Sequence, residues 1–236
     1  MNIEGSVALV TGANRGLGSA FAQALLDAGA AKVYGAARDP GSIARPGVIP
    51  LRLDVTNPAD IAQAVRDAGD VTLLVNNAGI STGSSALGPD AVELARLEME
   101  TNFFGPLQVS RAFAPVLAAN GGGGIVNVLS VLSWLTFPAA AMYAASKAAS
   151  WSLTNALRLE LHEQGTLVVG VHCGFLDTDM AAAIEAPKTD PAEVARAVLA
   201  AVEADAHEVL ADDTSTFVRS RLSDGVDALY PSVTRT

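Results

Sequence analysis

A tyrosine and a lysine at helical spacing could together move a proton. Tyr143 and Lys147 lie four residues apart, so a helix over this segment would place both side chains on one face. A phenol with a pKa of about 10 is a weak acid–base catalyst at neutral pH, and a neighbouring ammonium favours the phenolate. We therefore expect Lys147 to lower the pKa of Tyr143. Taken alone, the same spacing is equally compatible with exposed surface side chains.

A hydroxyl lies thirteen residues before this tyrosine. Ser130 directly follows the apolar run 125–129, which is typical of a buried strand. In open α/β sheets, ligands bind outside the carboxyl ends of the strands. The position of Ser130 therefore favours a reacting site in which Ser130 and Tyr143 face one substrate.

Three glycines form a candidate phosphate-binding turn. Residues 7–10 are apolar and are followed by Thr11-Gly12-Ala13-Asn14-Arg15-Gly16-Leu17-Gly18, which opens into a helical pattern. Glycine permits a tight turn and lets backbone N–H groups approach a pyrophosphate, which the start of a helix also attracts. The alternative is an ordinary strand-to-helix turn, but the flanking strand and helix favour a dinucleotide site.

Arginines near this turn indicate which dinucleotide is bound. The second apolar run ends at Ala37, close to where enzymes that use NAD usually carry a carboxylate for the adenosine ribose. Arg38 follows instead, and Arg15 lies inside the glycine turn, so two guanidiniums could hold a 2′-phosphate. We therefore expect NADP(H) in preference to NAD(H). The alternative is that both arginines are solvated and that Asp39 repels a phosphate.

The elements that must position these residues alternate between strands and helices. Amphipathic or alanine-rich segments separate short apolar runs, at residues 7–10, 32–37, 49–55, 71–75, 125–129 and 167–172. This alternation predicts a parallel sheet, and strands that are apolar throughout predict helices on both faces. The fold class is therefore α/β, a doubly wound parallel sheet of about seven strands. We expect one domain over residues 1–236, with a peripheral helix and tail from about residue 212.

Composition excludes some partners. With 25 acidic and 15 basic residues, the formal charge of −10 repels phosphate backbones, so nucleic acid is not expected as a partner. The apolar stretches are far shorter than the roughly 20 residues needed to span a bilayer, so no membrane contact is expected. The first residues do not resemble a secretory signal, and the single Cys173 cannot form an intramolecular disulfide. We therefore expect a cytoplasmic protein.

With further motifs, these residues resemble the short-chain dehydrogenase/reductase family, which has a Rossmann fold. The resemblance runs from residue 7 to about residue 180, and its motifs stand in the family's order. They are the glycine turn, Asp54-Val55, Asn76-Asn77-Ala78-Gly79, Asn102, Ser130, Tyr143-x-x-x-Lys147 and Gly174-x-x-x-Thr178. The resemblance implies an oxidoreductase that moves a hydride between NADP(H) and the carbonyl or alcohol carbon of a small organic substrate.

The resemblance also implies roles for individual residues. Ser130 would bind the substrate oxygen, Tyr143 would exchange its proton, and Lys147 would grip the nicotinamide ribose. Asn102 would hold a water in the proton relay, and no metal is needed. Within the cofactor set, Asp54 and Val55 would contact the adenine, Thr178 would hold the carboxamide, and the 76–79 loop would line the cofactor and brace the sheet. The expected cofactor contacts are Gly12, Asn14, Arg15, Gly16, Leu17, Gly18, Arg38, Asp54, Val55, Asn76, Ala78, Gly79, Tyr143, Lys147, Gly174 and Thr178.

The chain departs from the family's usual pattern near the substrate. Cys173 stands where a proline is common, and Ser133 stands where a glycine is common. Phe175 and Met180 are candidate apolar contacts for the substrate, whereas packing is the better interpretation for Trp134. Three histidines lack metal-ligand spacing and are expected to have structural roles: His162, His172 and His207.

Two other functions are compatible with parts of the pattern. A non-catalytic NADP-binding sensor or scaffold could keep the fold, but such proteins usually lose a reacting residue, and Asn102, Ser130, Tyr143 and Lys147 are all present. An epimerase or dehydratase of the extended family could use the same tyrosine and lysine, but its glycine motif has different spacing. The resemblance also implies a homo-oligomer, a dimer or tetramer, formed through the helices that carry Asn102 and Tyr143.

Overall fold

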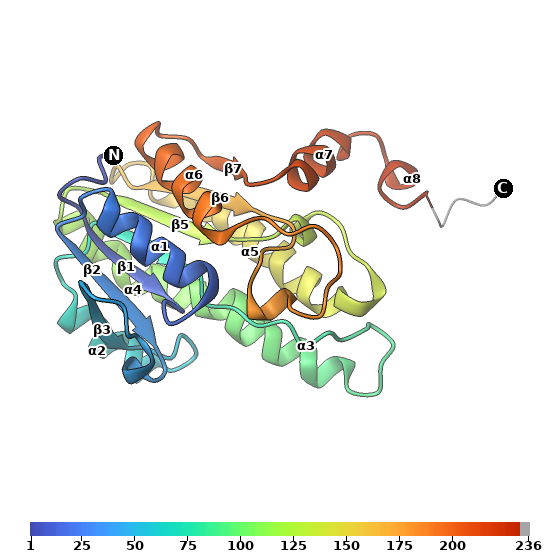
Figure 1. Ribbon diagram of the computed structural model, residues 1–236, viewed down its shortest axis with the longest axis horizontal. Helices are drawn as coiled ribbons and strands as arrows, with labels where there is room; N and C mark the ends of the chain where they lie inside the picture. Colours follow the sequence, from blue (N-terminus) through green and yellow to red (C-terminus); the bar gives the residue numbers. More distant parts are fainter. Residues whose placement is uncertain (232–236) are drawn as a thin grey trace.

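The computed structural model describes residues 1–231 and contains a sheet of seven parallel strands (Figure 1). The strand order β3-β2-β1-β4-β5-β6-β7 means that the chain builds outward from β1 and then crosses back to continue from β4. The boundary between β1 and β4 is therefore the switch point at which doubly wound sheets bind ligands. The strands are β1 Val7–Thr11, β2 Lys32–Ala37, β3 Val48–Arg52, β4 Leu73–Asn76, β5 Gly124–Val128, β6 Leu167–His172 and β7 Glu208–Leu210.

Helices cover both faces of the sheet, as the uniformly apolar strands predicted. On one face, Phe21 and Leu25 of α1 are fully buried in one cluster with Val10 of β1 and with α6. On the other face, α2, α4 and α5 pack over Leu9, and Phe113 of α4 is fully buried there. The helices are α1 Gly16–Asp27, α2 Pro58–Asp67, α3 Ala91–Met99, α4 Gly105–Ala119, α5 Ala141–Glu160, α6 Pro191–Glu203, α7 Asp213–Arg221 and α8 Val226–Leu229.

Short helical turns connect several of these elements. A π-helical turn, η2, joins α3 to α4 without a break, and its five residues include Asn102. The 3₁₀ turn η3 follows β5, and Ser130 is its N-cap residue. The turns are η1 Pro40–Ser42, η2 Glu100–Phe104, η3 Val131–Ser133, η4 Pro138–Ala140 and η5 Asp179–Ala181.

Two helices begin with a side-chain cap followed by a proline. The side chain of Asn57 accepts a hydrogen bond from the backbone N–H of Ala59 at 2.9 Å and caps α2. Asp190 caps α6 in the same way, with the N–H of Ala192 at 2.8 Å. A proline occupies the first helical position in both. These caps satisfy donors that would otherwise have no partner at a helix start.

Two strands differ from the sequence-based prediction. The predicted run 49–55 ends early, at Arg52, because the chain turns at Asp54. The Oδ1 atom of Asp54 accepts bonds from the N–H and the hydroxyl of Thr56 at 3.0 and 2.7 Å, and such local bonds compete with a sheet ladder. The seventh strand, β7, has three residues and is too short to produce a recognisable apolar run.

One edge of the sheet contains a proline. Strand β3 pairs only with β2, and its Pro50 stands opposite Gly35. Proline has no backbone N–H and is tolerated in a sheet mainly on an edge strand. This position of Pro50 agrees with the place of β3 at the end of the strand order.

The C-terminal helices α7 and α8 project to the right of the sheet in Figure 1. Asp212 caps α7 by accepting a bond from the N–H of Ser215 at 2.7 Å. The same carboxylate accepts a bond from the N–H of Gly174 at 2.5 Å, so it ties this segment to the end of β6. The predicted peripheral helix from about residue 212 is thus attached near the expected site.

Among residues 1–231, no helix has both the length and the apolar character that crossing a membrane requires.

Candidate active site

The predicted site residues gather at one edge of the sheet because all seven strands are parallel. Strand β1 ends at the glycine turn, β4 ends at Asn76, and β5 ends two residues before Ser130. Strand β6 ends at His172, just before Gly174. The carboxyl ends of parallel strands meet at the same edge, so segments far apart in the sequence form a single site.

The glycine turn is a cradle that side chains would fill. Gly12 and Gly16 have φ angles of 67° and 52°, in the left-handed region. A Cβ atom on Gly18 would lie 2.1 Å from the carbonyl oxygen of Gly12. Asn14 and Arg15 are exposed at the rim of the turn, whereas the side chain of Leu17 is buried in the core. The turn therefore offers backbone N–H groups and a helix start to a phosphate group, so the residues present fit a dinucleotide.

Thr11 and Asn77 hold this turn against β4. The Thr11 hydroxyl accepts bonds from the N–H groups of Asn77 and Ala78 at 2.9 and 3.0 Å. The Asn77 amide donates to the carbonyl oxygens of Thr11 and Gly12 at 2.9 and 3.3 Å. Neither residue was named individually as a site residue, although Thr11 stands within the glycine-turn motif and Asn77 within the 76–79 loop that was expected to brace the sheet. They are positioning residues for the turn.

Asn76 points into the protein interior. Its amide donates to Ser110 at 2.9 Å and to Asn127 at 2.8 Å, in a buried network that braces β4 and β5. Gly79, three residues after Asn76, lies next to Asn102 and, being glycine, has no side chain there. A Cβ atom there would lie 3.1 Å from Oδ1 of Asn102, so the missing side chain leaves space for that amide.

Helix α5 carries Tyr143 and Lys147 on one face, and both turn toward the end of β5. The Lys147 Nζ atom lies 5.6 Å from the centre of the Tyr143 ring. It donates to the carbonyl oxygen of Val128 at 2.9 Å. The Ser130 hydroxyl lies near enough to the phenol to influence its pKa; it donates to the carbonyl oxygen of Cys173 at 3.4 Å and accepts a bond from the N–H of Leu132 at 3.1 Å. The structure therefore brings the predicted hydroxyl, phenol and ammonium together.

The expected direction of the Tyr143 pKa is wrong. Burial raises the pKa of Tyr143 above its ordinary value, Cys173 and Glu98 add to the rise, and the hydrogen bond from Ser130 opposes it. Lys147 is itself buried, and burial lowers its pKa to about 8. Removal from water disfavours both charged forms and is the largest cause of both shifts. The phenol therefore keeps its proton at neutral pH.

Asn102 is fixed within the π-helical turn η2. Its Oδ1 atom accepts a bond from the N–H of Ile80 at 2.8 Å, and its Nδ2 atom donates to the carbonyl of Ile80 at 2.9 Å. The same amide donates to Ser146 at 2.9 Å, and the Asn102 carbonyl accepts from Ser150 at 2.6 Å. Single π turns occur mostly at functional sites. Asn102 thus connects the loop after β4 to the helix of Tyr143.

The two arginines that were expected at a 2′-phosphate do not converge. Arg15 extends toward the segment after β6, where its Nη1 atom lies 3.2 Å from the carboxylate of Asp179, and both side chains are exposed. Arg38 lies near the turn after β3. Burial opposes ionisation of Asp54, but bonds from Thr56 and the charges of Arg38 and Arg52 hold its pKa below the ordinary value. Arg38 is therefore the arginine positioned near the predicted adenosine contact.

The remaining predicted residues lie around this edge. Val55 is buried against Gly105, where an added Cβ atom would lie 2.8 Å away. The methyl group of Thr178 lies 3.2 Å from the position of a Cβ atom on Gly16, so the segment after β6 covers the glycine turn. Phe175 and Met180 are exposed at 37% and 58%, and their contact with a substrate stays a prediction.

The strand order and the glycine turn at the switch point define a dinucleotide-binding fold of the Rossmann type. Residues 6–189 match the family model described as short chain dehydrogenase, and the chain belongs to the short-chain dehydrogenase/reductase family of oxidoreductases. A 3-oxoacyl-(acyl-carrier-protein) reductase, FabG, of Vibrio cholerae is 34% identical over 193 residues, which cover 78% of this chain and 79% of the relative.

Solved structures show the same fold. A short chain dehydrogenase from Burkholderia cenocepacia in complex with NADP is 41% identical and has a TM-score of 0.94, with both chains covered completely. A short chain dehydrogenase/reductase from Burkholderia phymatum in complex with NAD is 26% identical and has a TM-score of 0.84, with 95% of each chain covered. The family thus includes structures with either nicotinamide dinucleotide.

Proposed function

We propose that the protein is an NADP(H)-dependent oxidoreductase that interconverts the carbonyl and alcohol forms of a small organic substrate. One observation carries the proposal: Ser130, Tyr143 and Lys147 meet at the sheet edge that also holds the glycine cradle. A bound nicotinamide would supply or accept the hydride. The surrounding protein would hold the substrate oxygen and exchange one proton with it.

The positions of the side chains support the following proton chemistry. In the reducing direction, Tyr143 donates its phenolic proton to the carbonyl oxygen, and its raised pKa ensures that the proton is present. Ser130 donates a hydrogen bond to the same oxygen as negative charge develops on it. Lys147 places a positive charge beside the phenolate that remains, and Asn102 holds the water through which the proton is replaced. In the oxidising direction the same groups act in reverse.

Lys147 is expected to set an upper pH limit for ketone reduction. Its pKa of about 8 means that the ammonium is present below this pH and lost above it. We expect kcat/KM for the carbonyl substrate to fall by about tenfold per pH unit above that value. In Lys147→Arg the guanidinium stays charged, so the decline should move to higher pH even if the maximal rate is lower. An unchanged pH profile in this variant would assign the limit to another group.

A preference for NADP(H) is supported by the residues at the end of β2. Ala37 cannot bind the ribose hydroxyls, and Arg38 can form charge-assisted hydrogen bonds with a 2′-phosphate. The neighbour from Burkholderia cenocepacia was solved with NADP. Arg15 would contribute to the phosphate site only after leaving Asp179, so Arg38 is the main determinant in this proposal.

Arg38→Ala is expected to remove the preference. The variant should raise the KM for NADPH by at least about tenfold, because hydrogen bonds to charged groups each contribute more than 1 kcal/mol. The KM for NADH should stay nearly constant. Arg66→Ala, which removes an exposed arginine from α2, is the matched control. Equal constants for both cofactors in the unmodified enzyme would contradict the proposed preference.

The direct test of the function is a substrate screen followed at the nicotinamide absorbance band. The panel contains ketones, aldehydes, secondary alcohols and 3-oxoacyl thioesters, each with NADPH and NADH. We expect NADPH oxidation with some carbonyl compounds. Tight cofactor binding without turnover on any compound would instead favour the sensor or scaffold. Conversion of a substrate with no net change in cofactor would favour the epimerase.

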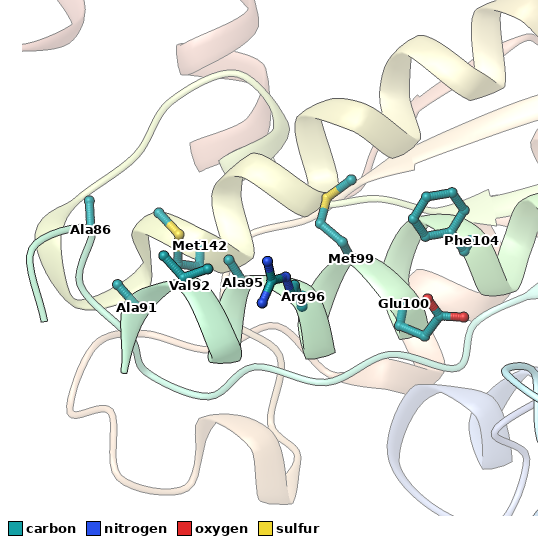
Figure 2. Close-up of a pocket in the computed structure, with 9 residues that line it drawn as sticks. All are labelled: Ala86, Ala91, Val92, Ala95, Arg96, Met99, Glu100, Phe104 and Met142. Carbon is teal, nitrogen blue, oxygen red and sulfur yellow. The ribbon is translucent and has the colours of Figure 1, made fainter. Parts of the chain in front are cut away.

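We also propose that the protein forms a homo-oligomer through α3, α4 and the start of α5. A hollow of about 560 Å³ lies along α3, and Val92 of α3 and Met142 of α5 both line it (Figure 2). Val92 and Phe104, which line this hollow, are exposed at 66% and 42%. Large apolar side chains on one exposed face are typical of a surface that a second copy covers.

Val92→Asp should therefore shift the protein toward the monomer. A carboxylate buried in an apolar interface is expected to weaken association by at least about 100-fold, measured by size-exclusion chromatography with light scattering. Phe217→Asp changes an exposed aromatic residue on α7, away from this surface, and is the control.

A proposed cytoplasmic setting is supported by the lone, buried Cys173, which suits a reducing compartment.

A further inference from the structure

His172, the last residue of β6, packs against the backbone of Ser130, the serine proposed to bind the substrate oxygen. The ring is fully buried, and its Nδ1 atom lies 3.0 Å from the Ser133 hydroxyl and 3.3 Å from the Ser130 carbonyl oxygen. The Ser133 hydroxyl donates to that same carbonyl oxygen at 2.6 Å. Two side-chain groups therefore meet at the main-chain oxygen of Ser130, the residue whose hydroxyl lies near Tyr143.

The hydrogen positions in this cluster follow from its acceptors. A carbonyl oxygen can only accept, and the Ser133 hydroxyl has a single hydrogen, which it donates to Ser130. The Nδ1 atom of His172 must then carry a hydrogen and donate toward Ser133 and Ser130. Burial lowers the pKa of His172 to about 4, so the ring is neutral at pH 7 and its hydrogen is on Nδ1.

Aromatic stacking holds the imidazole ring in place, and residues of β7 and α7 lie next to it. Trp134 stacks on it with ring centres 3.6 Å apart and 15° between the planes. Its Nε2 atom lies 3.8 Å from a carboxylate oxygen of Glu208 on β7 and has no hydrogen-bond partner among residues 1–231. Arg219 of α7 binds Glu208 at 3.0 Å and lies 5.7 Å from the Trp134 ring. Stacking on Trp134 therefore fixes one face of the ring, whereas Nε2, which carries no hydrogen, makes no bond to Glu208.

We propose that His172 is a positioning residue for the reaction: through Nδ1 and Ser133 it fixes the peptide group that carries the Ser130 hydroxyl. The inference rests on the proposed function, because it takes Ser130 as the group that binds the substrate oxygen. Rigid support matters here, since a displacement of about 1 Å at a reacting group can reduce a rate by about 100-fold. Trp134, which stacks on the ring and lies beside Arg219 of α7, extends this support to the C-terminal segment.

Two amide substitutions separate this role from simple packing. In His172→Asn, the amide reaches about as far as Nδ1 and can still donate to Ser133 and Ser130. In His172→Gln, the amide reaches about as far as Nε2 and faces Glu208 instead. Both variants lose the aromatic stack on Trp134, so each is expected to lower Tm. Asparagine leaves more empty space, so a packing role alone would make His172→Asn the weaker enzyme.

The positioning role predicts the opposite order in kcat. We expect kcat to fall by about tenfold or more in His172→Gln and by less than about threefold in His172→Asn, with the Kd for NADPH unchanged in both. Ser133→Ala, which removes the intervening hydroxyl with little change in volume, should lower kcat as His172→Gln does. If His172→Gln does not fold, Ser133→Ala provides the test instead. A normal kcat in Ser133→Ala, or a lower kcat in His172→Asn than in folded His172→Gln, would overturn the inference.

A double variant separates failure of this inference from failure of the proposed function. In a Ser130→Ala background, His172→Gln should have no further effect on kcat, because the hydroxyl that it positions is gone. If Ser130→Ala alone leaves kcat unchanged, the proposed role of Ser130 is wrong. If Ser130→Ala is slow and His172→Gln slows it further by its full factor, Ser130 acts as proposed but His172 does not act through it.

Discussion

Tyr143→Phe is expected to bind NADPH normally and to lose turnover by roughly 10²–10⁴-fold, the usual contribution of a general acid. The substitution removes only the hydroxyl. The ring packs beside the apolar cluster that includes Val131, Leu132 and Ala144, and phenylalanine preserves this packing. Because burial keeps the phenol protonated, the lost group is a proton donor that is ready at neutral pH.

The variant is tested by fluorescence titration with NADPH and by single-turnover reduction of a substrate found in the screen. Tyr34→Phe removes another phenol, which binds Asp70 at 3.0 Å, and is the matched control. Its turnover should be unchanged. If Tyr143→Phe reduces the substrate at more than about a tenth of the normal rate, Tyr143 is not the acid.

Gly18→Ala is expected to abolish dinucleotide binding. The new Cβ atom would lie 2.1 Å from the carbonyl oxygen of Gly12 and 2.5 Å from the Asn77 amide nitrogen. The first of these is backbone and cannot move without opening the turn. We expect the Kd for NADPH to rise by at least about 100-fold, because displaced N–H groups no longer bind the pyrophosphate.

The control is Gly69→Ala, just after the end of α2. An added Cβ atom there has one neighbour, 3.5 Å away, and the φ angle is not in the left-handed region. This variant should fold and bind NADPH as the unmodified protein does. Circular dichroism and Tm distinguish a misfolded Gly18→Ala protein from a folded one, and a folded variant with normal affinity would contradict the role of the turn.

Much of the architecture could be predicted because its signals are local. The apolar runs at 32–37 and 167–172 coincide with β2 and β6, since buried parallel strands require continuous apolar sequence. The start of α2 at Asn57 and Pro58 is a signal of the same local kind, because capping depends on adjacent residues. The glycine turn was recognisable because its backbone conformation and close packing exclude other residue types.

Features that depend on distant contacts could not be predicted. The pKa of Tyr143 is set mainly by burial, and no spacing of residues reports how much water the fold excludes. Arg15 pairs with Asp179, which is 164 residues later in the chain. His172 was expected to be purely structural because its partners, Ser133 and Glu208, come from separate segments. Such contacts form only when the fold brings these distant segments together.

Pro50 restricts how copies of the protein can associate. An exposed edge strand is a template onto which a strand of another molecule can add, and that ladder needs a backbone N–H at successive positions. At the β3 edge, proline interrupts the series. Growth of the sheet from one molecule into the next is therefore disfavoured on that side. This disfavours strand-mediated aggregation at the β3 edge and agrees with the proposed association through side chains of helices.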